Sequence, residues 1–137
     1  MSAYVKIKYR SLNSGQQENY NFQKVAALLA DYGFNCLRLS DDWQGADFIA
    51  CHFDGQTFLK VQLKGRLTID KKYIGKEIHI AFLHDGNCYL YPHDEVLNLI
   101  RSHGVMNEKS ARWGIDGIRN WPQPPAWAVT MLAEYRL

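Results

Sequence analysis

A tight-turn signal stands between two apolar runs near the middle of the chain. The dipeptide Asp54-Gly55 separates residues 48–53 from residues 57–64, and Asp-Gly is among the strongest short signals for a β-hairpin. The two runs are therefore predicted to pair as antiparallel strands. Since the turn sets the register, we expect Asp47 to lie opposite the segment from Gln62 to Lys64.

Polar residues recur at alternate positions in the second of these runs. Positions two apart share a face of a strand, and between Phe58 and Arg66 the even positions include Lys60, Gln62, Lys64 and Arg66, whereas the odd positions hold Leu59, Val61 and Leu63. We predict one buried face and one polar face. An amide oxygen and an ammonium beside a carboxylate are suited to hold a divalent cation and a phosphate together. The same residues also fit an ordinary solubilising sheet face.

A helix is predicted over residues 15–32, before these strands. Ser14 and Gln17 have the spacing of a capping box, and Gly33 fits a helix C-cap. Glu18 lies four residues before Phe22 of the apolar stripe, so it shares the core-facing side of the helix. Glu18 is then either an acid stabilised by the helix dipole or a second carboxylate beside Asp47.

The remaining pattern predicts an α/β fold. Further strands are expected over residues 34–39, 77–83 and 88–91, with a polar turn from Ser40 and a second hairpin turn at Asp85-Gly86, and a short helix over 93–101. A chain of 137 residues suits one domain. We predict a mixed central sheet of about five strands flanked by helices, with a core over about 14–101 and an aromatic-rich extension over 102–137.

Positive charge is concentrated after the polar strand. The formal net charge of the chain is only +2, yet residues 60–76 contain six basic residues and one acid. Four of these basic residues follow Lys64, and they are expected to contact a phosphate backbone without reading its sequence: Arg66, Lys71, Lys72 and Lys76. The alternative is a solvated loop. In the extension, Arg112, Trp113, Arg119 and Trp121 fit either core cover or an interface with nucleic acid or a second copy.

Cysteine and histidine spacing argues against a zinc site or a thiol nucleophile. Cys36, Cys51 and Cys88 are widely spaced in apolar stretches, and they are expected to be reduced core residues. Cys51 and His52 are adjacent, so a strand would point them to opposite faces. The N-terminus lacks a long apolar stretch, and no run has membrane-spanning length, so we expect a cytoplasmic protein that does not bind membranes.

The order of these elements, with Glu18, Asp47, Gln62 and Lys64 as motif positions, resembles the PD-(D/E)XK nuclease superfamily over roughly residues 14–101. The resemblance implies a restriction endonuclease-like core, as in small homing endonucleases or Holliday junction resolvases. The sequence departs from the motif at Ala46, which replaces proline, and at Gln62, which replaces the acid.

The resemblance also implies a mechanism and partners. Mg²⁺, for which Mn²⁺ can substitute, would be held by Asp47, Gln62, Glu18 and the backbone carbonyl of Leu63, and Lys64 would orient the attacking water. The expected activity is metal-dependent hydrolysis of DNA phosphodiesters, with RNA as a possible substrate, in a homodimer that brings two sites to a duplex. The rival hypothesis is a catalytically inactive nucleic-acid-binding or assembly module, for which the neutral Gln62 argues.

Overall fold

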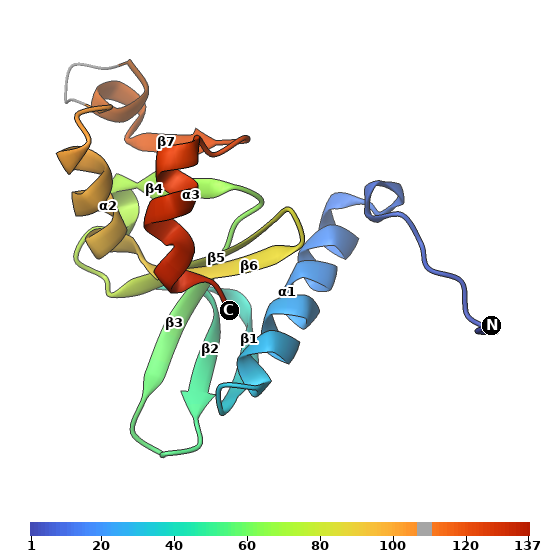
Figure 1. Cartoon of the computed structure of the whole chain (residues 1–137). Helices are drawn as coiled ribbons and strands as arrows, with labels where there is room; N and C mark the ends of the chain where they lie inside the picture. The colour runs from blue at the N-terminus through green and yellow to red at the C-terminus, as the bar shows by residue number, and fades with distance from the viewer. Residues whose placement is uncertain (107–110) are drawn as a thin grey trace.

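A computed structural model describes residues 1–106 and 111–137 of the chain. Its main sheet has five strands in the order β1-β2-β3-β5-β6 (Figure 1). β3 and β5 run parallel, and every other neighbouring pair is antiparallel. The strands are β1 (Phe34–Trp43), β2 (Ala46–His52), β3 (Phe58–Leu63), β5 (Ile78–His84) and β6 (Asn87–Pro92). The prediction of a mixed, roughly five-stranded sheet flanked by helices is confirmed.

The hairpin between β2 and β3 forms in the predicted register. Phe48 lies opposite Val61, and the N–H of His52 donates to the carbonyl of Thr57 at 2.9 Å. Asp54 closes the turn, because its carboxylate accepts hydrogen bonds from the backbone N–H groups of residues 56 and 57. Gly55 has a φ of +73°, a conformation that glycine adopts without strain. Short-range turn chemistry is therefore sufficient to bring Asp47 to β3.

Helix α1 (Ser14–Ala30) covers one face of the sheet. Val25 and Leu29 are buried against Phe48, Ala50 and other residues of β2, β3, β5 and β6. The capping box is formed one residue earlier than predicted. Asn13 accepts from the N–H of Gln16 at 2.8 Å, and its own N–H donates to the Gln16 side chain at 3.0 Å. Both candidate pairs have the same spacing, and asparagine caps as well as serine does.

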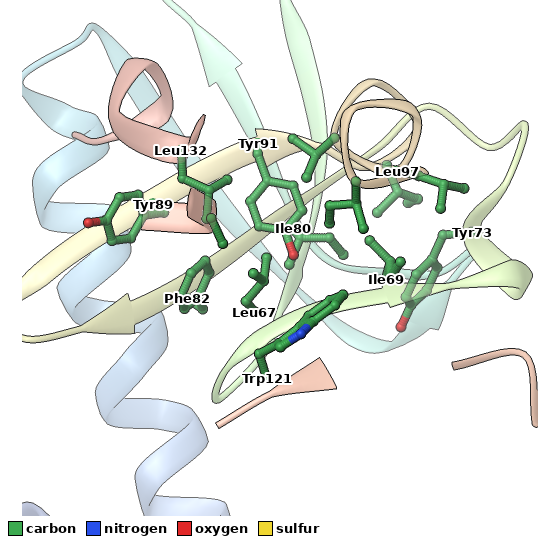
Figure 2. Packing of buried hydrophobic residues seen from close by; sticks show 14 of the residues in the cluster. Leu67, Ile69, Tyr73, Ile80, Phe82, Tyr89, Tyr91, Leu97, Trp121 and Leu132 are labelled. Carbon is green, nitrogen blue, oxygen red and sulfur yellow. The ribbon is translucent and has the colours of Figure 1, made fainter. Parts of the chain in front are cut away.

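A second layer covers the other face of the sheet. It contains the antiparallel pair β4 (Leu67–Asp70) and β7 (Ile118–Trp121), with helices α2 (His93–Ser102) and α3 (Ala126–Leu132). Figure 2 shows Leu67, Ile69 and Trp121 packed beneath Ile80 and Phe82 of the main sheet. β4 was not predicted, and the segment after Lys64 is not one continuous basic loop. All four residues of β4 are buried, so the basic residues of the segment lie on either side of a core strand.

The aromatic residues of the extension provide core cover. Trp113 is 1% exposed and Trp121 is 9% exposed, which favours that interpretation over an interface for these two side chains. The extension also contains a π-helical turn, η3 (Ala111–Asp116), and ends in a short 3-10 turn, η4 (Ala133–Tyr135). The N–H of Leu137 donates to the carbonyl of Cys88 at 2.9 Å, so the C-terminus lies against β6.

The end of the first strand and the burial of the cysteines differ from the expectation. The first strand does not end at residue 39, because β1 continues to Trp43 through a register shift after Arg38. The turn falls instead at Gln44 and Gly45, which both have positive φ. The cysteines have free thiols, but only Cys88 is fully buried.

Among the described residues, no helix is both long and apolar enough to cross a membrane.

Candidate functional site

Asp47 lies near the start of β2 and is tied to β3. Its Oδ2 accepts a hydrogen bond from the backbone N–H of Leu63 at 2.8 Å. Burial raises the pKa of Asp47; the Leu63 N–H and the Lys64 ammonium oppose this shift, while the carboxylates of Glu18 and Asp42 add to it. Asp47 is therefore an acid in a partly desolvated place that already contains negative charge, and binding a cation would stabilise its ionised form.

Gln62 lies beside Asp47 on β3, with an unpaired oxygen. The residue is only 9% exposed, and its buried Oε1 accepts no hydrogen bond from any residue that the structure describes. Its Nε2 lies 3.5 Å from the carbonyl oxygen of Leu63, at the long limit of a hydrogen bond. An acceptor buried without a partner costs about 1–3 kcal/mol. Such an atom is well placed to accept a cation.

The expectation that Gln62 stands on an open polar face is wrong. The residue paired with Gln62 on β5 is Ile80, which is fully buried in the core beneath the second layer. The face that carries Gln62 is thus covered at Gln62 itself, whereas Phe58 on the same face is exposed and Lys60 and Lys64 are half-buried. The solubilising interpretation does not fit a glutamine that is more than nine-tenths buried.

Lys64 follows β3 and lies over an aromatic ring. Its backbone N–H donates to the carbonyl of Ala81 at 2.9 Å, and its Nζ lies 5.4 Å from the ring centroid of Tyr73. Burial, aided by the Lys72 ammonium, lowers the pKa of Lys64, while the carboxylates of Asp70, Asp47 and Asp42 oppose that shift. A half-desolvated ammonium beside Asp47 is a stronger acid than an exposed lysine.

Glu18 faces the same hollow from α1. This hollow has a volume of about 420 Å³ and is lined by residues of α1, β2 and β3, including Glu18, Asp47, Gln62 and Lys64. The four predicted residues therefore converge. Glu18 lies beyond the first turn of α1, where the helix dipole has little effect. The dipole interpretation is accordingly not supported.

Glu18 is also engaged by a cation that the sequence did not reveal. Its Oε1 lies 3.4 Å from Nη2 of Arg38 on β1, and Arg38 also donates to Asn19 at 2.6 Å and lies over the ring of Phe22. Both partners of the pair are partly exposed, so the contact contributes little to stability. Its consequence is local, because Arg38 offsets part of the negative charge that Glu18 brings to Asp47.

The oxygen donors suit a hard cation such as Mg²⁺ or Mn²⁺ in kind and in charge. Two carboxylates, the unpaired amide oxygen of Gln62 and the nearby carbonyl of Leu63 are all ligands that these ions prefer. Within the described part of the chain, no three or more His, Cys, Asp or Glu side chains are arranged to hold a metal ion. A metal at this place would thus depend on Gln62 and on the backbone.

The four predicted phosphate contacts lie in different environments. Arg66 is exposed just after Lys64 and lies 3.4 Å from the side-chain oxygen of Asn120, and Lys76 is exposed before β5. Lys72 lies over the ring of Tyr73, as Lys64 does, with its Nζ 5.1 Å from the ring centroid. Lys71 instead lies over the ring of Trp113 at 5.2 Å. Tyr73 is 1% exposed and packs in the core.

The sequence analysis missed a residue that lines the hollow. Tyr9 belongs to the 3-10 turn η1 (Tyr9–Ser11), before α1. Its hydroxyl accepts a hydrogen bond from Nδ2 of Asn21 at 3.0 Å, and its ring lies edge-on to Tyr20 with 5.3 Å between centroids. The alternation of basic and apolar residues just before α1 was the sequence pattern that could have drawn attention to Tyr9.

Comparison with known proteins identifies the fold. No protein-family model and no curated protein matches the sequence. Among solved structures, the bacterial homing endonuclease I-Ssp6803I is similar with a TM-score of 0.51 and 14% identity, over 91% of this chain and 88% of that chain. The Holliday junction resolvase Hjc of Archaeoglobus fulgidus matches 56% of this chain and 72% of its own, with a TM-score of 0.44 and 14% identity. The chain therefore has a restriction endonuclease-like fold, similar to that of I-Ssp6803I.

Proposed function

We propose that this chain is a magnesium-dependent endonuclease that hydrolyses phosphodiester bonds of DNA. The observation that carries the proposal is the convergence of Asp47, Gln62 and Lys64 at the open end of β3, with the Gln62 oxygen buried and unpaired. An amide oxygen of this kind has little structural use beside a carboxylate. It gains a partner if a cation binds between them.

The residues that would hold the ion are Asp47, Gln62, the carbonyl of Leu63, and Glu18 directly or through water. Bound Mg²⁺ supplies positive charge to a phosphoryl oxygen and lowers the pKa of a water molecule. Mn²⁺ accepts the same oxygen donors. Asp47 provides most of the negative charge that would balance the metal ion, because Gln62 is neutral and Glu18 is paired with Arg38.

Lys64 acts on the reacting phosphate. Its ammonium is close enough to Asp47 to influence that residue's pKa, and it orients the attacking water and stabilises the charge that develops on phosphorus. Arg66, Lys72 and Lys76 follow along the chain and hold the flanking phosphates, with Lys71 displaced toward Trp113. Cleavage of both strands of a duplex then requires a homodimer with two sites.

A second candidate function is nucleic-acid binding or assembly without catalysis. The Glu18–Arg38 ion pair favours it, because Arg38 offsets the charge of Glu18 and Gln62 is neutral, which leaves Asp47 as the main source of negative charge for a metal ion. Cleavage of RNA is a variant of the first proposal, since metal-assisted attack on a phosphodiester uses the same groups in DNA and RNA.

The two candidates differ in one measurement. Purified protein is incubated with supercoiled, linear and branched DNA, and in parallel with RNA, in Mg²⁺, Mn²⁺ or EDTA. We expect metal-dependent cleavage of DNA that is lost in Asp47→Ala and Lys64→Ala and kept in Lys24→Ala, which changes an exposed lysine of α1. Intact binding without cleavage in either metal would establish the second candidate instead.

A further inference from the structure

Residues 1–12, here called the N-terminal arm, extend away from the domain. Figure 1 shows this segment leaving the start of α1 and passing outward from the sheet. Every residue from Met1 to Ser11 is exposed, and Tyr4 and Val5 are about nine-tenths exposed. A segment with this much exposed apolar surface indicates a surface that contacts a partner.

The arm carries only positive charge. Lys6, Lys8 and Arg10 are its charged side chains, and it has no acid. Lys6 and Lys8 alternate with Val5 and Ile7, so in an extended chain the two lysines share one side. Residues two apart in extended backbone are about 6.6–6.8 Å apart, whereas phosphates of one DNA strand follow every ~3.4 Å along the helix axis. Each lysine therefore reaches a different phosphate.

The arm is anchored at the wall of the candidate site. The side chain of Gln17 donates to the carbonyl of Tyr9 at 3.3 Å, and Asn21 donates to its hydroxyl. Tyr9 lines the hollow that contains Asp47 and Lys64, and it also lines the adjoining hollow that runs from Lys64 to His84. Any polymer that places a phosphate at Lys64 passes directly beside the base of the arm.

We propose that the N-terminal arm is a nucleic-acid clamp, in which Lys6, Lys8 and Arg10 hold the phosphate backbone next to the bond that is cleaved. This inference rests on the proposed function of the same site. Arg66 supplies positive charge just after Lys64, and the arm supplies it from the α1 side, so basic residues flank the site in two directions. The contacts are with phosphate and are independent of base sequence.

The test is the salt dependence of binding to uncleaved DNA. A labelled duplex is titrated in EDTA with the wild-type protein and with the Lys6→Ala/Lys8→Ala/Arg10→Ala variant. Each lost phosphate contact lowers the slope of log affinity against log salt by about 0.9. Three contacts predict a slope lower by about 2.7, so that between about 50 and 200 mM salt the wild type loses about 40-fold more affinity than the variant.

Two control variants separate charge from other effects. Lys6→Arg/Lys8→Arg/Arg10→Lys keeps the charge of the arm, and we expect the wild-type slope. Val5→Ser/Ile7→Ser keeps all three basic residues, and we expect an unchanged slope and an unchanged oligomeric state by light scattering. All the substituted residues are exposed, so thermal melting should show that these variants fold like the wild type.

The outcomes distinguish this inference from the proposed function. Wild-type binding and cleavage, with the same slope in the alanine variant, would overturn the clamp and leave the nuclease proposal standing. Loss of self-association in Val5→Ser/Ile7→Ser, with no slope change in the alanine variant, would assign the arm to a second copy of the chain, for example at the edge strand β1 with its exposed Leu37 and Trp43. Wild-type protein that neither binds nor cleaves DNA would remove both proposals.

Discussion

The carboxylate of Asp47 accepts a hydrogen bond from the backbone N–H of Leu63, which fixes the acid of β2 to the strand that carries Gln62. The donor and the acceptor belong to two paired strands of the central sheet. Sites built on paired strands hold their geometry better than sites built on loops. The bond therefore sets the spacing between the acid and the amide before any ligand arrives.

Asp47→Asn is expected to abolish metal-dependent cleavage and to stabilise the metal-free protein at neutral pH. Burial raises the pKa of Asp47, so the folded protein binds more protons than the unfolded chain as pH rises from about 3.9 to the raised value, and wild-type stability falls through that window. Asparagine does not ionise, yet it can still accept from the Leu63 N–H. Thermal melts across pH should show an advantage for the variant that grows through this window and is absent below it. A variant that is less stable than wild type at pH 7 would contradict this reasoning.

Gln62→Glu should bind Mg²⁺ about tenfold more tightly, or about 1.4 kcal/mol, and be less stable without it. A third carboxylate near Asp47 and Glu18 adds like charge in a buried place, and the cost is about 1–3 kcal/mol. Mg²⁺ binds only the folded state and restores stability. Thermal melts with and without Mg²⁺ measure both effects, and Gln23→Glu on the exposed side of α1 is the control. Equal responses of the two variants to Mg²⁺ would show that Gln62 is not a ligand.

Lys64→Ala should lower kcat by about 10²–10³ through loss of a preorganised charge. The affinity of the Lys64→Ala variant for uncleaved DNA should fall far less than its kcat, because only one phosphate contact among several is removed. Lys64→Arg keeps the charge but not the compact ammonium over Tyr73, so we expect partial activity. Single-turnover cleavage and binding in EDTA separate the two steps, with Lys24→Ala as control. A fall in affinity as large as the fall in kcat would make Lys64 a binding residue only.

Local signals in the sequence were sufficient for the hairpin and for most of the candidate site. The Asp54-Gly55 turn determines which residues of β2 and β3 are neighbours, so Asp47 and Gln62 were paired correctly from sequence alone. The second turn signal, Asp85-Gly86, likewise located β5 and β6 as an antiparallel pair. The capping box was misplaced by one residue because two candidate pairs had equal spacing.

Long-range packing is the part that the sequence did not reveal. Gln62 is buried because the second layer covers its face, and that layer includes β7, more than fifty residues later. β4 was missed because it is only four residues long and lies among lysines and arginines, and its apolar–polar alternation does not show that all four residues are buried. The contact between Glu18 and Arg38 depends on where β1 lies beside α1. No pattern within either segment predicts it.

Tyr91→Phe should destabilise the fold by about 1–3 kcal/mol, because the hydroxyl of Tyr91 joins the two layers. This fully buried hydroxyl donates to the carbonyl of Thr68 and accepts from the N–H of Thr68 at 3.1 Å, so it satisfies both backbone groups of a residue in β4. Phenylalanine keeps the ring but leaves these two groups buried without a partner. The matched control is Tyr89→Phe, which preserves the stacking of that ring on Phe82, 5.2 Å away between centroids (Figure 2). Urea denaturation should show a clear loss for Tyr91→Phe and a change within about 0.5 kcal/mol for the control, and equal losses would mean that the ring environment, not the hydroxyl, connects β4 to the main sheet.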